Sequence, residues 1–298
     1  MAHRDDTEML NHHHPVSRSP QRVVVIGSGG FVGGAVLARL MRANVPVLPI
    51  DRAKVDLLGI DAADTLAGLL RPGDAVVAVA AIAPVKNTRM LADNMRLVAT
   101  IIAALGKVKV AHVVNISSDA VYADGPLPLT ESSPMAPTSL HGAMHLAREL
   151  AFTAEAGAPL ANLRPTLIYG ASDPHNGYGP NRFRRLAEAG HDIVLFGAGE
   201  ERRDHVHVDD VAELIFRVVG HQSSGALNIA TGEVHSFLEI ANATVSVAGK
   251  AVAVRAAPRV GPMPHNGYRP FDNAACRQAF PDFCYTPLGE GLRKSATR

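Results

Sequence analysis

A run of β-branched residues that leads directly into a glycine-rich turn constrains the fold of this chain more than any other feature. Residues Val23–Ile26 are continuous and apolar, as expected for a strand buried on both faces of a parallel sheet. A predicted helix, clearest over residues 35–42, follows the turn. In this context Gly27 permits a tight turn, Gly30 lets the backbone approach a pyrophosphate, and Gly33 lets the helix pack on the strand. Because the N-terminus of a helix attracts anions, the segment predicts a dinucleotide-binding site.

Apolar runs and helical patterns alternate along the part of the chain that follows. We expect further strands over residues 45–50, 75–81, 111–116 and 161–167, and further helices over residues 91–105, 140–156 and 181–189. Strands that alternate with helices in this way predict an α/β fold, with a doubly wound parallel sheet of the Rossmann type and right-handed crossovers.

The regular alternation weakens after residue 170. Residues 171–200 are rich in Gly, Asn and Pro, and the last part of the chain contains Pro-rich loops. We therefore expect a smaller C-terminal α/β lobe over the carboxyl edge of the sheet, where ligands bind in open α/β folds. The predicted organisation is a disordered tail over residues 1–20, an NAD-binding domain over residues 21–170 to which residues 204–230 return, and a substrate-binding lobe over residues 171–203 and 231–298.

The polar first segment and the charge balance narrow the class of protein. The predicted tail lacks the apolar core of a signal peptide, and we interpret residues 12–14, all His, as solvated rather than as metal ligands. With 29 basic and 28 acidic side chains, the net charge of +1 gives no reason to expect nucleic acid or a membrane surface as a partner. No apolar stretch is long enough to span a bilayer, and Cys276 and Cys284 are expected to be reduced thiols. These features predict a cytoplasmic protein.

An acidic residue at the end of the second predicted strand bears on the choice of dinucleotide. A carboxylate at Asp51 would accept hydrogen bonds from both ribose hydroxyls and would repel a 2′-phosphate. This favours NAD over NADP. Arg52 leaves NADP open, since a guanidinium there could hold the phosphate.

Six segments together carry a resemblance to a known family. They are Gly27-x-x-Gly30-x-x-Gly33, Val55–Leu58, Ala80-Ala81, Asn115–Tyr122, Arg164–Gly170 and Gly197–Val211. On these segments the chain resembles, over residues 22–290, the extended short-chain dehydrogenase/reductase superfamily in its NAD-dependent nucleotide-sugar epimerase/dehydratase branch. The resemblance implies that NAD contacts Gly27, Gly30, Phe31, Val32, Gly33, Asp51, Arg52, Asp56, Leu57, Ala80, Ala81 and His145.

The resemblance also implies a nucleotide-sugar substrate and a homodimer. Ser118 lies at the position of the family's catalytic hydroxyl, and Arg203 and Asn181 lie where the family contacts the substrate's diphosphate. Arginine suits the second role because its fork of donors matches phosphate oxygens. The predicted helices over residues 91–105 and 140–156 resemble those that form a four-helix dimer interface in the family.

The catalytic Tyr-x-x-x-Lys of the family is replaced here by His141-x-x-x-His145. In the family the Tyr moves a proton at a sugar hydroxyl, while the Lys lowers the Tyr pKa and holds the nicotinamide ribose. Lowering a phenol pKa from about 10 to about 7 takes roughly 4 kcal/mol, whereas an imidazole starts near 6.5. His141 could therefore serve as acid and base without a neighbouring ammonium, and His145 could still bond a ribose hydroxyl.

Three other interpretations of the His pair stay open. An imidazole nitrogen reaches less far than a phenol oxygen, so the chain could bind NAD and a nucleotide sugar without catalysis, as a regulator or scaffold. Histidines at i and i+4 have metal-ligand spacing, but only Asp119 is a nearby third ligand and we predict no metal. Both rings could also be inert on a packed helix face.

The residues after Ser118 narrow the reaction. The related 4,6-dehydratases carry Asp-Glu where this chain has Asp119-Ala120. The missing Glu argues against dehydration, so the predicted reaction is 4-epimerisation or keto-sugar reduction. The candidate catalytic residues are Ser118, Asp119, His141 and His145.

Overall fold

The computed structural model describes residues 9–296, which form a central parallel sheet with a second, smaller group of strands and helices at one end. The sheet has six strands in the order β2-β1-β3-β4-β5-β9. The strands are β1 (Val23–Ile26), β2 (Val47–Ile50), β3 (Ala75–Ala78), β4 (His112–Ile116), β5 (Leu160–Pro165) and β9 (Gly225–Ile229). All pair in parallel, and the strand order reverses between β1 and β3, so a crevice is expected there at the carboxyl ends of the strands.

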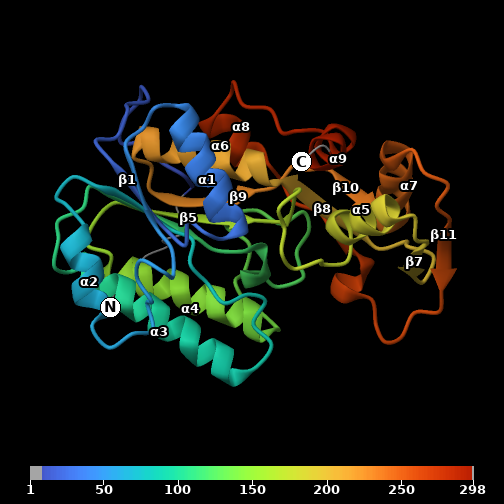
Figure 1. Ribbon diagram of the computed structural model, residues 1–298, viewed down its shortest axis with the longest axis horizontal. Helices are drawn as coiled ribbons and strands as arrows, with labels where there is room; N and C mark the ends of the chain where they lie inside the picture. Colours follow the sequence, from blue (N-terminus) through green and yellow to red (C-terminus); the bar gives the residue numbers. More distant parts are fainter. Residues whose placement is uncertain (1–8, 297–298) are drawn as a thin grey trace.

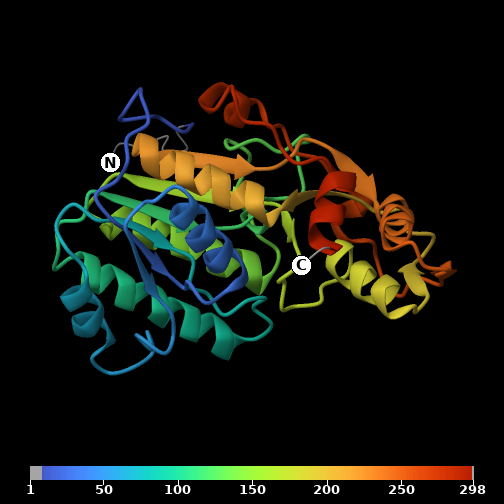
Figure 2. The same cartoon turned by 45° about the horizontal axis from the view of Figure 1, so that its top comes forward.

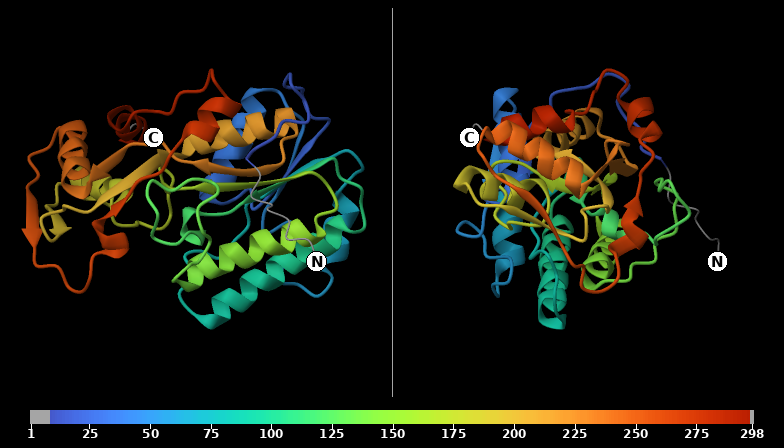
Figure 3. Two further views of the ribbon diagram at one scale, coloured as in Figure 1. Left: turned by 180° about the vertical axis from the view of Figure 1, so that it is seen from behind. Right: turned by 90° about the vertical axis from the view of Figure 1, so that its right-hand side faces the viewer.

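Helices cover both faces of this sheet (Figure 1). One face carries α1 (Phe31–Arg42), α6 (Val208–His221) and the short α8 (Ala274–Ala279). Figure 2 shows α1 and α6 side by side on this face. The opposite face carries α2 (Ala62–Leu69), α3 (Thr88–Leu105) and α4 (Leu140–Glu155), and α3 and α4 pack along each other (Figure 3, left).

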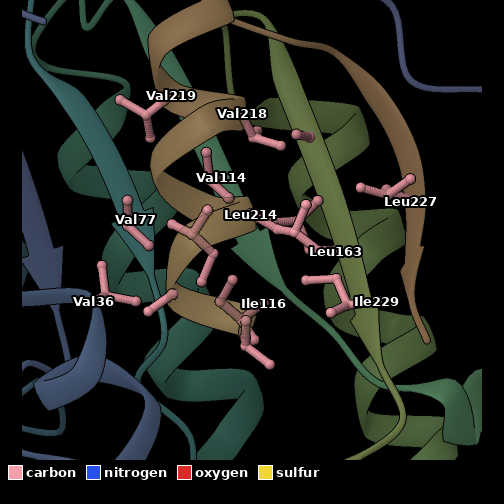
Figure 4. Packing of buried hydrophobic residues seen from close by; sticks show 14 of the residues in the cluster. Val36, Val77, Val114, Ile116, Leu163, Leu214, Val218, Val219, Leu227 and Ile229 are labelled. Atoms are coloured by element: carbon pink, nitrogen blue, oxygen red, sulfur yellow. The ribbon is translucent and has the colours of Figure 1, made fainter. Parts of the chain in front are cut away.

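The two-residue period of the strands explains why helices cover both faces. In β1, Val23 and Val25 belong to the apolar cluster under α1 and α6, whereas Val24 and Ile26 belong to the cluster under α2, α3 and α4. Figure 4 shows the first cluster, in which side chains of α6 such as Leu214 meet those of the sheet. The predicted doubly wound α/β fold is therefore confirmed.

The remaining elements form the smaller lobe (Figure 1, right). A second sheet contains β6 (Leu167–Tyr169), β8 (Arg202–His207), β10 (Val234–Ser236) and β12 (Tyr268–Arg269), and β7 (Ile193–Phe196) pairs in parallel with β11 (Val254–Ala257). The helices of the lobe are α5 (Pro180–Ala189), α7 (Phe237–Ala248) and α9 (Leu288–Ala296), and its 3-10 turn is η2 (Pro264–Gly267). Another 3-10 turn, η1 (Asp119–Val121), follows β4 of the main sheet and packs against α4. Phe183 and Phe237 bury the contact between α5 and α7.

The first described residues pack against the sheet instead of extending into solvent. Asn11 exchanges backbone hydrogen bonds with Ser224, next to β9, at 2.8 and 2.9 Å. The ring of His12 stacks on His221 with centroids 4.2 Å apart, and its Nδ1 lies 2.7 Å from Ser223 Oγ. The prediction of a disordered tail is therefore wrong for residues 9–20, because long-range partners hold them; residues 1–8 lie outside the described residues.

Two other differences concern where elements belong. The sequence pattern predicts no helix at α2, where the structure has one. It also predicts that all of residues 231–298 belong to the lobe, whereas Cys276 and Phe280 of the α8 region pack into the core of the main sheet. Cys276 and Cys284 are free thiols, as expected. Within residues 9–296, no helix combines the length and apolar character that a membrane span requires.

Candidate functional site

A cavity of about 1050 Å³ lies at the carboxyl ends of the main strands and extends under the lobe. It brings together nearly every site residue predicted from the sequence. The predicted residues that line it are Gly27, Gly30, Phe31, Val32, Asp51, Arg52, Asp56, Leu57, Ala80, Ala81, Ser118, Asp119, His141, His145, Asn181 and Arg203. Gly33 does not, because it is buried beneath the glycine turn. One end of the cavity is thus formed by the glycine turn and the other by β8 and the start of α5.

The glycine turn has the geometry of an anion cradle. A Cβ on Gly27 would lie 2.6 Å from Ala80 N, and one on Gly33 would lie 2.1 Å from Gly27 O, so neither position admits a side chain. Gly30 caps α1 without any side-chain hydrogen bond, and the first turn carries no acidic residue. The helix therefore presents unpaired N–H groups and its positive end to the cavity, as a dinucleotide pyrophosphate requires.

The residues predicted to bind the cofactor ribose lie at the rim of the end of the cavity that the glycine turn forms. Asp51 is exposed, and its Oδ1 accepts a hydrogen bond from Lys54 N at 2.9 Å. Arg52 is 83% exposed and lies 3.5 Å from Asp56, to which it forms an ion pair. The carboxylate predicted to bind the ribose is therefore accessible, while the guanidinium of Arg52 pairs with Asp56.

Ser118 and Asp119 follow β4 and are held by local and long-range bonds. Ser118 Oγ accepts a hydrogen bond from Ala120 N at 3.1 Å and lies 3.3 Å from Asp119 Oδ1. Arg269 of β12 is 1% exposed; its Nε lies 3.4 Å from Asp119 Oδ2, and its Nη2 donates to Asp119 O at 2.9 Å. Arg269 of the lobe thus pairs with the Asp119 carboxylate and holds the Asp119 backbone in place. Nothing in the sequence indicates this contact.

The first turn of α4 places the His pair beside this segment. Ser139 caps the helix by accepting a hydrogen bond from Gly142 N at 3.1 Å. A Cβ on Gly142 would lie only 2.1 Å from Ala120 O, so the absence of a side chain lets α4 approach η1 closely. This approach puts His141 near Asp119. His145 follows one turn later, and the two rings meet edge to face with centroids 4.7 Å apart.

Burial keeps both imidazoles neutral near pH 7. Desolvation lowers the pKa of His141 from its usual 6.5, although Asp119 opposes the change. The pKa of His145 is lowered well below 6.5, by burial first, then because a second cation beside His141 is unfavourable, and also by the charge of Arg148. Nδ1 of each ring is buried without a hydrogen-bond partner among the described residues, which leaves Nε2 as the nitrogen that can meet a ligand.

The end of the cavity that β8 and the start of α5 form contains the predicted diphosphate contacts, but their side chains already have partners. Asn181 Oδ1 accepts a hydrogen bond from Gly170 N at 3.0 Å, and Arg203 lies 3.3 Å from Glu201 Oε1. His205, interpreted from sequence as structural, also lines the cavity, and its Nε2 has no partner in the described part of the chain. No group of three or more potential metal ligands comes together within residues 9–296.

The chain belongs to the NAD dependent epimerase/dehydratase family, which it matches over residues 23–230. Family membership confirms the expected cofactor, NAD, and the expected extended short-chain dehydrogenase fold.

Individual known proteins resemble the chain over most of their length. It is 27% identical over 308 residues to the UDP-glucose 4-epimerase of Mycolicibacterium smegmatis (strain ATCC 700084 / mc(2)155), with 92% of this chain and 97% of that protein aligned. The crystal structure of the Thermus thermophilus UDP-glucose 4-epimerase in complex with NAD superposes with a TM-score of 0.80 at 24% identity, covering 92% of this chain and 97% of that one. A GDP-6-OMe-4-keto-L-xylo-heptose reductase from C.jejuni superposes with a TM-score of 0.78 at 15% identity, covering 93% and 97%. At these identities the two structures show the fold alone.

Proposed function

We propose that this protein is an NAD-dependent nucleotide-sugar 4-epimerase or keto-sugar reductase that uses His141 as its acid and base. The observation that carries the proposal is the single cavity that joins the glycine turn, Ser118, His141 and Arg203. The UDP-glucose 4-epimerase that resembles the chain over most of its length supports the first of these reactions. Dehydration is not proposed, because Ala120 stands where the resemblance calls for a Glu.

The roles of the residues follow from where they lie. NAD, when bound, would supply and take up the hydride at the ring carbon. His141 Nε2 would accept the hydroxyl proton as the ring C–H hydride leaves and the C–O bond becomes a carbonyl, and it would return the proton on reduction. Ser118 Oγ would orient that oxygen, while His145 would bond the cofactor ribose. Arg203 and Asn181 would hold the diphosphate once their present partners exchange.

The direction of the His141 pKa shift makes a pH prediction. Only the neutral ring can accept a proton, so the oxidative half-reaction should be fully active above the pKa of His141 and should fail as the pH falls through it. Because burial lowers that pKa below 6.5, the acid limb is expected below pH 6.5, with a plateau through pH 7 to 8. His141→Ala should abolish turnover across the whole profile.

A second candidate is a catalytically inactive NAD and nucleotide-sugar binding protein, in a regulatory or scaffold role. The buried His145 favours it, since a neutral imidazole at this position supplies little of the positive charge that a lysine would supply. The imidazole nitrogen of His141 also reaches less far than the phenol oxygen of a tyrosine, which likewise favours an inactive protein.

One experiment separates the two candidates. NADH binding and turnover would be measured with a panel of UDP-, GDP- and dTDP-hexoses and their 4-keto derivatives. Turnover that His141→Ala removes, with NADH binding retained, supports the enzyme. Binding of both ligands without turnover across the panel supports the inactive protein, and failure to bind NAD or NADH rejects both.

We also propose a homodimer that forms through α3 and α4. The outward face of α4 exposes Leu150 (59%) and Leu140 (38%), which a partner could cover. Light scattering of the protein and of Leu150→Glu tests this, with a monomeric parent protein contradicting the proposal.

A further inference from the structure

One arginine of α4 is buried without a counter-charge. Arg148 lies one turn after His145 and is 1% exposed. Its Nη1 donates to Ala80 O and its Nη2 to Ala78 O, both at 2.7 Å, and its Nε donates to Asn115 Oδ1. These acceptors are neutral, and no carboxylate in residues 9–296 pairs with the guanidinium.

The next residue shows how unusual this arrangement is within the same helix. Glu149 pairs with the equally buried Arg164 through two bonds of 2.7 and 2.9 Å, so that charge is compensated. Burial lowers the pKa of Arg148 to about 10, and the group remains a cation at pH 7. A buried cation of this kind costs several kcal/mol unless its surroundings compensate it. Its presence beside the candidate site points to a use for the charge.

The contacts of Arg148 place that charge under the end of the cavity that the glycine turn forms. Ala80 lines the cavity, and its backbone N packs against the glycine turn so closely that Gly27 admits no Cβ. Asn115 belongs to β4, which leads into Ser118. The resemblance aligns His145 with the lysine of the family, and the charge of Arg148 contributes to the lowering of the His145 pKa.

We propose that Arg148 is a positioning residue that supplies the fixed positive charge missing at position 145. This inference rests on the proposed function, because it concerns the cofactor of that same site. The charge attracts the anionic dinucleotide and favours the neutral dihydronicotinamide of NADH over the cationic ring of NAD⁺. Arg148 also holds the end of β3 against the glycine turn, so its charge and its hydrogen bonds must be tested apart.

The test compares Kd values of NADH and NAD⁺ at pH 7.5, by NADH fluorescence and by its displacement with NAD⁺. The variants are Arg148→Met, Arg148→Lys and the double variant His145→Lys/Arg148→Met, and the control is Arg42→Met, which removes an exposed charge at the far end of α1. Arg148→Met should weaken NADH binding and reduce the preference for NADH over NAD⁺ by about tenfold, equivalent to ~1.4 kcal/mol of charge interaction. Arg148→Lys and the double variant should keep the ratio of the Kd values of NADH and NAD⁺ within about twofold of that of the parent protein, because each retains a positive charge in this part of the site. Arg42→Met should change nothing.

Each outcome decides the matter. A folded Arg148→Met protein with the parental preference overturns the inference, as does a double variant that stays as weak as Arg148→Met, because then only the hydrogen bonds matter. If Arg148→Met does not fold, a folded Arg148→Lys protein decides alone: the parental preference supports the inference and its loss overturns it. Failure of the parent protein to bind either nucleotide rejects the proposed function itself.

Discussion

Substitution of Gly142 by Ala tests the geometry that sets the position of His141. An added Cβ would lie 2.1 Å from Ala120 O and 2.7 Å from Pro137 Cβ, whereas ordinary contact begins near 3.4 Å. The nearest atom is backbone, so it cannot rotate away. The first turn of α4 must therefore retreat from η1 by about 1 Å, and His141 must move with it.

The expected effects differ for stability and for activity. Alanine gains about 1 kcal/mol over glycine within a helix, which offsets part of an overpacking cost of about 1–3 kcal/mol. We expect a net loss of stability of about 1 kcal/mol. A displacement of about 1 Å at a proton-transferring group lowers kcat by on the order of 100-fold. NADH affinity should change little, since the glycine turn is not involved.

Gly68→Ala is the matched control, because Gly68 lies inside α2 with nothing within 4 Å of the added Cβ. This variant should gain about 0.5–1 kcal/mol and retain its kcat. Urea unfolding measures the stability of both variants, and steady-state kinetics with the substrate found in the panel measures kcat. If Gly142→Ala gains stability as Gly68→Ala does and retains its kcat, the close approach of α4 to η1 does not position His141.

Three further predictions concern buried and exposed carboxylates. Glu149→Gln leaves the buried Arg164 without its counter-charge and should destabilise the protein by about 3–5 kcal/mol in urea unfolding, and an effect below 1 kcal/mol would contradict this. Burial raises the pKa of Asp204 from 3.8 to about 6, so the folded protein holds the proton more tightly than the unfolded chain does. The contribution of Asp204 to the free energy of unfolding is therefore greatest below pH 4 and falls by ~3 kcal/mol as the pH rises to about 6. Asp204→Asn should remove this fall from the pH dependence of stability measured by urea unfolding. Asp51→Asn should remove the repulsion of a 2′-phosphate and raise NADPH affinity relative to NADH by about tenfold at low salt, and an unchanged ratio of Kd values would exclude Asp51 from the ribose site.

The sequence predicted the elements whose cause is local. The apolar run of β1 and the glycines after it specify a buried strand, a turn and a helix within a short stretch of chain, and these predictions were confirmed. The cavity also gathers the predicted residues, because strand ends of a parallel sheet meet at one edge.

Features that depend on distant partners were missed. Nothing around Asp119 indicates Arg269, which arrives from β12 some 150 residues later. Likewise, a polar N-terminal segment looks solvated until Ser223 and Ser224 are brought beside it. Arg148 resembles an ordinary helix residue, and only the packing of α4 on the ends of β3 and β4 reveals that its charge is buried.

The ordered N-terminal segment also decides how two copies of this protein can meet. A parallel sheet can grow by adding a strand from another molecule at either edge. Residues 9–11 lie along β9 and occupy that edge, while the opposite edge strand, β2, contains Pro49, which has no N–H to donate. Growth of the sheet into a second molecule, whether into a shared dimer sheet or an aggregate, is therefore disfavoured at both ends. A partner copy is left with the helical faces, and trimming the chain back to Arg22 would reopen one edge to self-association.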